Sequence, residues 1–579
     1  MSDKPPCAAT LSRGVVTGEP YDLLPREFFV IQSVCCWMAL CGAPTDSYET
    51  WQSQVVTAEK LPPTIGTRLR DRTVIEFANR KPTPPYLRWT VAVQLDDGTI
   101  WAGSRGGLMR WVPGDRHWRL FHSRRWLPDN HVQNLAVVRP GEVWVTTPGG
   151  RAKIFLRKTT LERKMTAIGR ELRKRHLRFG LVGSIQWKQA GKPQAGWFQP
   201  DSDNDGLWTA LYVAAESFRY GATGDVSARK NAWESLKALM FLEKITGRPG
   251  FVARSVVPIS INKQGQRPWE RAADGKWWWK GDTSSDELDG HFFAYAVYYD
   301  IAATEQQKAE IRPVVARIAD HIMKNGYTYV DPFGRRTTWG MWAPDQLNRN
   351  PEWVAERGLN SMELLSYLKV AAHITGRDTY KRAARELVEK HGYAMNTIPL
   401  KQFAPFDEET NHSDDELAFV AYYPLLRYER DPLLRRIYML SITRSWKFER
   451  PEGSPLFNLI YATALQAGRW NKTGRRPPAG LVNPLRYDRD VCLKWFREVP
   501  SDLIEWTVIN SKRRDLGPLH IGRHGNLSNR RVLPIAERRI MRWNGNPYQL
   551  DGGGGGRERD DGTFILLPYW MGRYHRLLD

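Results

Sequence analysis

Four polar clusters, each followed directly by an apolar segment of helical length, constrain the fold of this chain most. They are rich in Asp, Asn, Ser and His, and they span residues 201–206, 281–291, 356–363 and 411–417. After the first cluster, Leu207, Leu211 and Ala215 keep the spacing of one helix face. The sequence therefore predicts helices in antiparallel pairs, in which every second helix begins with a polar cluster at a common end.

A repeated helix joint supports this arrangement. Residues 222–225 and 374–377 both contain Thr-Gly between two helical segments, and glycine is the usual residue where a helix ends. We expect about ten helices between residues 158 and 470 on this pattern.

A second kind of repeat lies nearer the N-terminus. Trp101 and Trp144 are 43 positions apart, as are Gly107 and Gly150, and this is the length of one four-stranded propeller blade. Together with residues 127–132, the two stretches resemble the propeller repeats of two-component-regulator sensor proteins. Because two blades cannot close a ring, we expect a partial propeller or a small β-domain here.

The chain is strongly basic, with 85 Lys and Arg against 63 Asp and Glu and a net charge of +22. Such a field attracts polyanions. The sequence contains no zinc-finger or RNP-type motif, so a nucleic acid is not the expected partner, and a solvated basic surface is the alternative. Five cysteines indicate neither a disulfide framework nor a cysteine metal site.

One apolar segment favours export. It covers residues 28–43, follows Arg26 and ends in small residues before Pro44, and its length suits a signal peptide better than a membrane span. A buried helix is the alternative. With export we expect a periplasmic or extracellular protein without a stable membrane span.

The polar clusters contain more acids than helix capping requires. Asp286 and Asp289, at i and i+3, lie on one helix face, as do His412 and Glu416 at i and i+4. Carboxylates held close together raise one another's pKa, as a general acid at neutral pH requires. Capping by Asp, Ser and Asn is the alternative and explains one residue in each cluster.

Paired helices that begin with acidic, Asn-His and Arg residues resemble the α/α-toroid glycoside hydrolases and polysaccharide lyases. In the hydrolases an acidic pair flanks the scissile bond, which implies Asp286 or Asp289 together with Asp414 or Asp415. In the lyases an Asn-His pair acts with Tyr and Arg on a uronate, which implies Asn411, His412, Tyr423 and Arg357. Carboxylates outnumber His and Tyr in the clusters, so we expect hydrolysis ahead of β-elimination. A non-enzymatic periplasmic sensor or glycan-binding protein is the third reading.

The substrate would be an acidic polysaccharide or oligosaccharide, held by aromatic rings and by polar groups near the clusters. Arg573 and Tyr574 near the C-terminus are expected either in a packing tail or at the rim of the cleft. The expected substrate-binding residues are Asp203, Asp205, Trp208, Trp279, Asp282, His291, Trp339, Trp342, Arg357, Asn360, Asn411, Arg573 and Tyr574.

No metal or cofactor is required. Residues 201–206 match the opening of a calcium loop, but position twelve is Tyr212 instead of a bidentate Glu, so calcium is only an alternative.

The predicted fold is mainly α: an α/α toroid preceded by a propeller-like β region and followed by a mixed segment that contains β structure. In the last segment we expect strands at residues 506–509 and 564–567. The predicted parts are a leader at 1–45, β-rich repeats at 46–157, a helical connector at 158–180, the catalytic domain at 181–470 and the mixed segment at 471–579.

Overall fold

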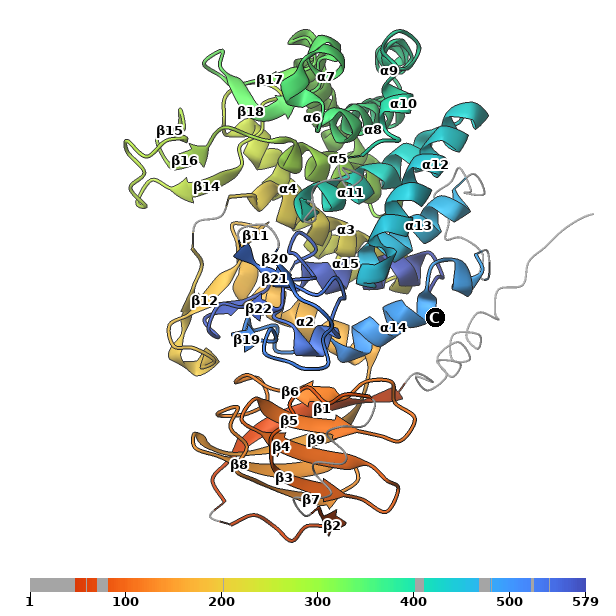
Figure 1. The fold of residues 1–579 in the computed structure, drawn as a ribbon. Coiled ribbons are helices and arrows are strands. Elements are labelled where there is room, and N and C mark those ends of the chain that lie inside the picture. The colour runs from red at the N-terminus through yellow and green to blue at the C-terminus, as the bar shows by residue number, and fades with distance from the viewer. Residues whose placement is uncertain are drawn as a thin grey trace, which may run out of the picture. The chain divides into compact units, whose positions relative to one another are not determined.

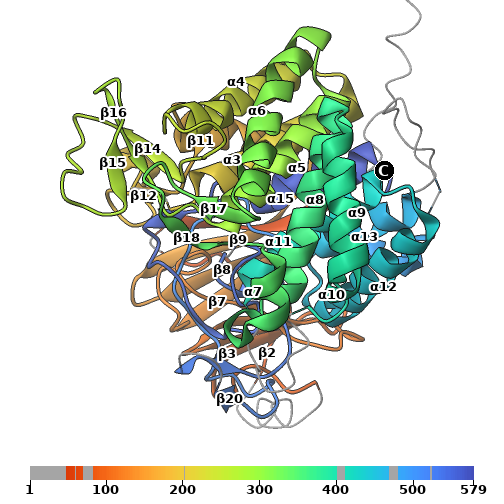
Figure 2. The same ribbon diagram turned by 90° about the horizontal axis from the view of Figure 1, so that it is seen from above.

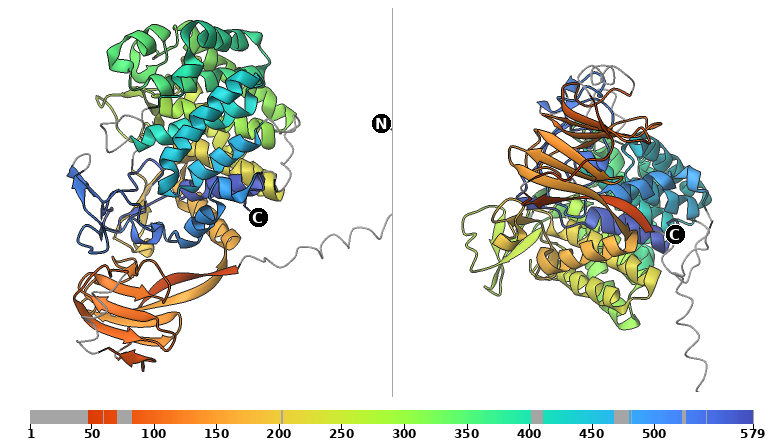
Figure 3. Two further views of the ribbon diagram at one scale, coloured as in Figure 1. Left: turned by 45° about the vertical axis from the view of Figure 1, so that its right-hand side comes forward. Right: turned by 90° about the horizontal axis from the view of Figure 1, so that it is seen from below.

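The β region consists of two antiparallel sheets. In the first, the strand order is β1 (Ser47–Val56), β9 (Gly150–Thr160), β8 (Glu142–Thr147) and β7 (Asn134–Arg139). In the second it is β2 (Thr67–Arg68), β3 (Trp89–Gln94), β4 (Ile100–Ser104), β5 (Gly107–Trp111) and β6 (Arg119–Phe121). Figure 1 shows these strands in orange, and Figure 3 shows the long ladder formed by β1 and β9.

This computed structural model describes residues 47–58, 60–69, 82–200, 203–400, 411–467, 480, 482–521, 525–540 and 542–578. The predicted leader at 1–45, and Asp201 and Ser202 of the first polar cluster, lie outside these ranges.

The repeat in the sequence corresponds to equivalent strands in the two sheets. Trp101 lies on β4 and Trp144 on β8, each in the second strand of a three-stranded meander. Gly107 and Gly150 open the third strands with φ of 140° and 123°, which an L side chain rarely adopts. The two sheets share one apolar core, in which Trp51 of β1 packs edge-on against Trp101.

Among the described residues, six helices contact one another in a closed cycle. Each packs on the next, and the last returns to the first: α3 (Asp205–Thr223), α5 (Ser285–Ile301), α8 (Arg357–Thr375), α11 (His412–Tyr428), α13 (Pro455–Gln466) and α15 (Thr563–Tyr574). Figure 2 shows α3, α5, α8 and α11 as neighbours. Their side chains are buried on nearly every side, so these inner helices are apolar all round over most of their length.

A second set of helices packs on the outside of this cycle. They are α2 (Leu161–Glu171) on α15, α4 (Val226–Lys244) on α3, α6 (Glu305–Lys324) on α5 and α8, α9 (Asp378–His391) on α8, α12 (Pro432–Glu449) on α11 and α13, and α14 (Arg489–Glu498) on α13. These helices are amphipathic: α9 buries Tyr380, Ala383, Ala384 and Leu387, at the spacing of one face.

The repeated Thr-Gly joint ends two inner helices in the same way. Gly224 after α3 and Gly376 after α8 have φ of 75° and 74°, and the N–H of each donates to the carbonyl of the residue four positions earlier. A left-handed residue at this position lets the chain reverse into the next, outer helix.

Short elements fill the connections that lead into the inner helices. A three-stranded sheet of β14 (Ser255–Pro258), β16 (Trp277–Lys280) and β15 (Trp269–Arg271) precedes α5. The hairpin of β17 (Thr328–Val330) and β18 (Arg336–Met341) and helix α7 (Pro344–Arg349) precede α8, and α10 (Tyr393–Asn396) follows α9. The remaining strands are β10 (Leu177–Arg178), β11 (Leu181–Val182), β12 (Ile185–Trp187), β13 (Trp197–Phe198), β19 (Val508–Ile509), β20 (His520–Ile521), β21 (Leu527–Ser528), β22 (Asp551–Gly552) and β23 (Glu558–Arg559).

The C-terminal segment corrects one expectation. Residues 564–567 are not a strand but the first turns of α15, which closes the cycle between α13 and α3. A continuous apolar run does not distinguish a buried strand from a helix buried on all sides, and this helix is of the second kind. The strand expected at 506–509 is shorter, at Val508–Ile509.

The broad expectation is confirmed: the chain is a multidomain protein with more helix than strand, and the described part contains many small sheets and no closed barrel. Within the described part, no helix is both long and apolar enough to cross a membrane.

Candidate active site

The polar clusters meet where the inner helices begin. Asp286 and Asp289 lie in the first turns of α5, Glu363 in the second turn of α8, and Asp414 and Glu416 in the first turns of α11. The charges of these five carboxylates act on one another, although the residues come from three helices. We call these five residues the acidic cluster.

A close approach of α3 to α5 brings the first polar cluster to the same place. A Cβ on Gly206 would lie 3.0 Å from Cγ of Glu287 and 3.3 Å from Nε2 of His291, and a Cβ on Gly290 would lie 2.9 Å from the Cα of Leu207. Both positions need glycine because any larger side chain would push the two helices apart.

Asp286 is the half-buried member at the α3–α5 contact. Its Oδ2 accepts a hydrogen bond of 2.9 Å from Nδ2 of Asn204, the residue before α3. Arg254 binds the Asn204 amide and the carbonyl oxygens of Asp203 and Asp282, so one guanidinium ties the starts of α3 and α5 together. Burial raises the pKa of Asp286, against the lowering effect of Arg254 and Asn204.

Asp289 and Glu363 lie deeper and are fully buried. Asp289 lies against the hydroxyl of Tyr367. Oε2 of Glu363 accepts a hydrogen bond of 2.8 Å from the indole N–H of Trp342. Burial and the charge of Asp289 raise the pKa of Glu363 well above its usual range, and Asp286 and Asp414 add to the effect.

Helix α11 supplies the other side of the cluster. Nδ2 of Asn411 donates a hydrogen bond of 2.8 Å to the half-buried Asp414, while the side-chain oxygen of Asn411 caps the helix at Ser413. Glu416 is fully buried. Burial and the charge of Asp286 raise its pKa, while Arg542 and Trp543 act to lower it. The cluster thus has two half-buried acids, Asp286 and Asp414, and three fully buried ones.

A small cavity of about 40 Å³ lies beside the cluster, at the starts of α13 and α15. Its lining includes Glu452, Arg538, Arg542 and Trp543. Arg542 pairs with Asp560 and Asp561 at the start of α15, and its guanidinium stands 4.3 Å over the ring of Trp208 at the start of α3. All six inner helices among the described residues therefore contribute to this end.

His412 borders the same region. Its Nδ1 is 3.7 Å from both the Asp415 and the Glu452 carboxylates. Burial lowers the pKa of His412 to about 4, so its imidazole is neutral near pH 7, and burial raises the pKa of Glu452 above its usual range. Asp415 is itself buried and faces this pair.

Three of the four tryptophans among the predicted substrate-binding residues are core residues. Trp208, Trp279 and Trp342 are 6%, 3% and 0% exposed. Stacking on a sugar needs an open ring face, so these rings support the site from behind. Trp339, on β18, is 52% exposed and remains the candidate platform of the four.

The structure separates three further residues from the acidic cluster. Tyr423 lies in the last half of α11, where its hydroxyl contacts Nε2 of His575 at 3.1 Å. Tyr574 packs on Phe218 near the C-terminal end of α3, and Arg573 donates to the Tyr569 hydroxyl. They lie at the opposite ends of their helices, so the expected rim position of Arg573 and Tyr574 is corrected to a packing role.

The remaining predicted ligands divide into buried and accessible groups. Asp205 accepts from Ser255, Asn360 donates to the carbonyl of Met341, and His291 is fully buried beside Tyr295, so these three serve the framework. Asp203 is 66% exposed and pairs with Lys280 at 2.5 Å. The half-buried residues are Asp282, which accepts two hydrogen bonds from Thr338, and Arg357 at the start of α8.

Sequence reasoning left Glu287, Glu363, Glu416 and Tyr367 out of the predicted site. The first three carry strongly raised pKa values; burial brings that of Glu287 to about 8. A signal was present for Glu363 and Glu416, because the benefit of an acid to a helix fades beyond the first turn. An acid in the second turn of an apolar helix therefore calls for another explanation than capping.

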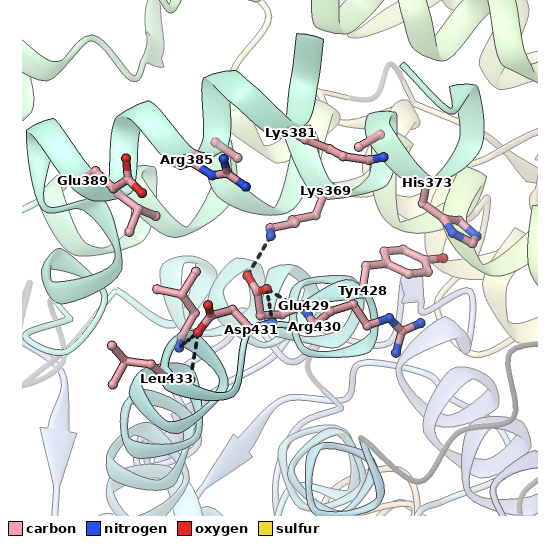
Figure 4. Close-up of a pocket in the computed structure, with 14 residues that line it drawn as sticks. Lys369, His373, Lys381, Arg385, Glu389, Tyr428, Glu429, Arg430, Asp431 and Leu433 are labelled. Carbon is pink, nitrogen blue, oxygen red and sulfur yellow. Dashed lines mark hydrogen bonds and ion pairs between the residues drawn. The ribbon is translucent and has the colours of Figure 1, made fainter. Parts of the chain in front are cut away.

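Among the described residues, no group of three or more His, Cys, Asp or Glu side chains is arranged to hold a metal ion. The cavity shown in Figure 4 has a volume of about 550 Å³ and lies at the other ends of α8 and α11.

No protein-family model matches the chain, and no curated protein matches its sequence.

Proposed function

We propose that this protein hydrolyses glycosidic bonds of an acidic polysaccharide or oligosaccharide, with the acidic cluster as its active centre. The observation that carries the proposal is that Asp286 and Asp414, from two helices, both act on the charge of the buried Glu363. Both acids are half-buried, whereas Asp289, Glu363 and Glu416 are fully buried. Burial raises the pKa of Asp286, which favours the protonated form that a donor to the leaving oxygen needs.

The proposal gives the two acids different roles. Asp286 is the proton donor, because its raised pKa favours the protonated form. Asp414, from α11, is the carboxylate partner; like Asp286, it accepts a hydrogen bond from an asparagine amide. Glycoside hydrolysis requires two carboxyl groups, one that donates a proton and one that acts as nucleophile or base.

The alternative of β-elimination has less support. It needs His412 and Tyr423 at one sugar, but eleven residues of α11 separate them, about 16 Å along the helix axis. Tyr423 is buried against His575 and Phe293. The net charge of +22 favours an acidic substrate under either reaction.

The fold classes belong to the proposal as well. We take the closed cycle of inner helices with its outer partners as an α/α toroid, and the two meanders as propeller-type blades that act as a scaffold. Contacts between Arg125 and Asp502, at 2.5 Å, and between His122 and Glu537 join these blades to the C-terminal segment. Export, proposed from residues 28–43, would bring the enzyme to the periplasm or the cell exterior, where polysaccharide substrates occur.

The test is a substrate panel of polyuronates, glycosaminoglycans and neutral glucans, incubated with the full-length protein. New reducing ends without the ultraviolet absorbance of an unsaturated uronate are expected on at least one acidic substrate. A rise in that absorbance would establish the lyase reaction instead. Binding of an acidic glycan with no new ends would favour the non-enzymatic glycan-binding reading.

A further inference from the structure

A cavity of about 550 Å³ lies between the last turns of α8, the inner side of α9 and the junction of α11 with α12 (Figure 4). It is at the opposite end of α8 and α11 from the acidic cluster, so it is a separate site. Its volume falls within the range of pockets that hold small organic molecules, about 300–1,000 Å³.

Four cationic side chains line this cavity, from three parts of the chain. Arg385 on α9 and Arg430 after α11 have no acidic side-chain partner within the described ranges. Lys381 pairs only with the exposed Asp378, and such surface pairs are weak. Three cations are therefore available to a ligand.

Two of the three acids in the lining, Glu429 and Asp431, are engaged by the protein, and the third, Glu389, is exposed on α9 one turn from Arg385. Glu429 is 2% exposed; it pairs with Lys369 at 2.7 Å and accepts the backbone N–H groups of Arg430 and Asp431. Asp431 caps α12 by accepting from the N–H groups of Leu433 and Leu434. Arg435 and Arg436 line the adjoining hollow and extend the positive charge.

The floor of the cavity is apolar and aromatic. His373 and Tyr428 stack with ring centroids 4.1 Å apart and planes at 17°. Both hydrogen-bond to Asp300, at 2.7 and 3.0 Å, which fixes the pair in place. Ala372, Ala384, Val388 and Leu434 complete this surface.

We propose that this cavity binds a small organic anion: an oxyanion group, carboxylate or phosphate, on a body with an apolar face. The cations of the lining, Arg385 and Arg430 among them, attract the oxyanion, and a guanidinium matches its planar pair of acceptors. The body lies against His373, whose side chain is 36% exposed, and the apolar side chains beside it. Such a ligand is either a uronate released from an acidic glycan or a sugar phosphate, and the site does not depend on the proposed hydrolysis.

Isothermal titration of the full-length protein with four probes tests the proposal: glucuronate, glucose 6-phosphate, glucose and inorganic phosphate. Glucuronate, glucose 6-phosphate or both should bind, at least about tenfold more tightly than glucose. Binding should weaken as salt is raised, because it rests on charges near the surface. The comparison of the two anionic sugars identifies the source of the ligand.

Arg385→Gln and Arg430→Gln should each weaken binding about five- to tenfold. Arg382→Gln, on the exposed face of α9, is the matched control and should bind as the wild type does. Circular dichroism and thermal unfolding check that all three variants fold. Equal binding by all variants, no binding of either anionic sugar, or inorganic phosphate binding as tightly as both would overturn the proposal.

Discussion

The indole N–H of Trp342 donates a hydrogen bond of 2.8 Å to Oε2 of Glu363, and both side chains are fully buried. The tryptophan comes from the connection before α8 and the acid from the second turn of that helix. This bond partly offsets the cost of burying a carboxyl among other carboxyls. Trp342 therefore belongs to the support of the acidic cluster, and it has no open face for a sugar.

Trp342→Phe should lower the free energy of unfolding by about 2–3 kcal/mol, because it leaves a cavity and removes the donor to Glu363. Trp339→Phe is the matched control: its side chain is half exposed, so the change should stay within about 0.5 kcal/mol. Urea unfolding of both variants measures the difference. Equal losses would mean that the two rings do not differ in burial in solution.

Asp286→Asn and Asp414→Asn should each reduce turnover by a factor of about 10²–10⁴. This is the rate enhancement that a positioned general acid or base typically contributes. Neither change alters volume, so both variants should fold and still bind substrate. Asp378→Asn, exposed at the start of α9, is the control and should keep full activity. Undiminished kcat in both cluster variants, on a proven substrate, would place the reaction elsewhere.

Tyr423→Phe should keep the activity of the folded enzyme and lose about 1 kcal/mol of stability. Its hydroxyl contacts His575 and accepts from Arg427 at the end of α11 away from the cluster, so the loss is that of buried hydrogen bonds. Activity per folded molecule and thermal unfolding separate the two effects. A large loss of turnover in a stable Tyr423→Phe protein would instead support β-elimination.

The buried acids make stability fall with rising pH. Burial raises the pKa of Glu287 to about 8, whereas an unfolded glutamate titrates near 4.5. Between these values the folded state holds a proton that the unfolded state has lost, so the free energy of unfolding decreases as pH rises. Asp300 acts in the other direction: burial alone would raise its pKa, but His373 and Arg427 lower it to about 2, outside this window.

Glu287→Gln should remove part of this dependence. Between pH 5 and pH 8, the free energy of unfolding of the wild type should fall by at least about 1 kcal/mol more than that of the variant. The reason is that one pKa unit corresponds to about 1.4 kcal/mol. Glu310→Gln, on the exposed side of α6, is the control and should show the same pH dependence of the free energy of unfolding as the wild type. Urea unfolding at the two pH values gives the comparison, and parallel curves for wild type and Glu287→Gln would contradict it.

Much of the local structure could be predicted because it depends on near neighbours in the chain. The polar clusters mark the starts of α3, α5, α8 and α11, but the expectation that one residue of each cluster caps its helix is wrong for three of them: among the described residues of the clusters, only Asn411 at α11 accepts a backbone N–H as a cap. Gly224 and Gly376 end helices as their Thr-Gly context indicates. The spacing of Trp101 and Trp144 predicts two equivalent strands, because a repeat of one strand pattern builds one meander each time.

The starts of the helices follow from the local sequence, whereas the exposure of the residues there depends on how the helices pack against one another. Asp286 and Asp289 share a helix face by spacing, yet the first is half-buried and the second fully buried. An inner helix is covered on all sides by neighbours distant in the chain, such as α15, so its own periodicity cannot tell a core position from a cleft position. The same packing buries Trp342 and leaves Trp339 open.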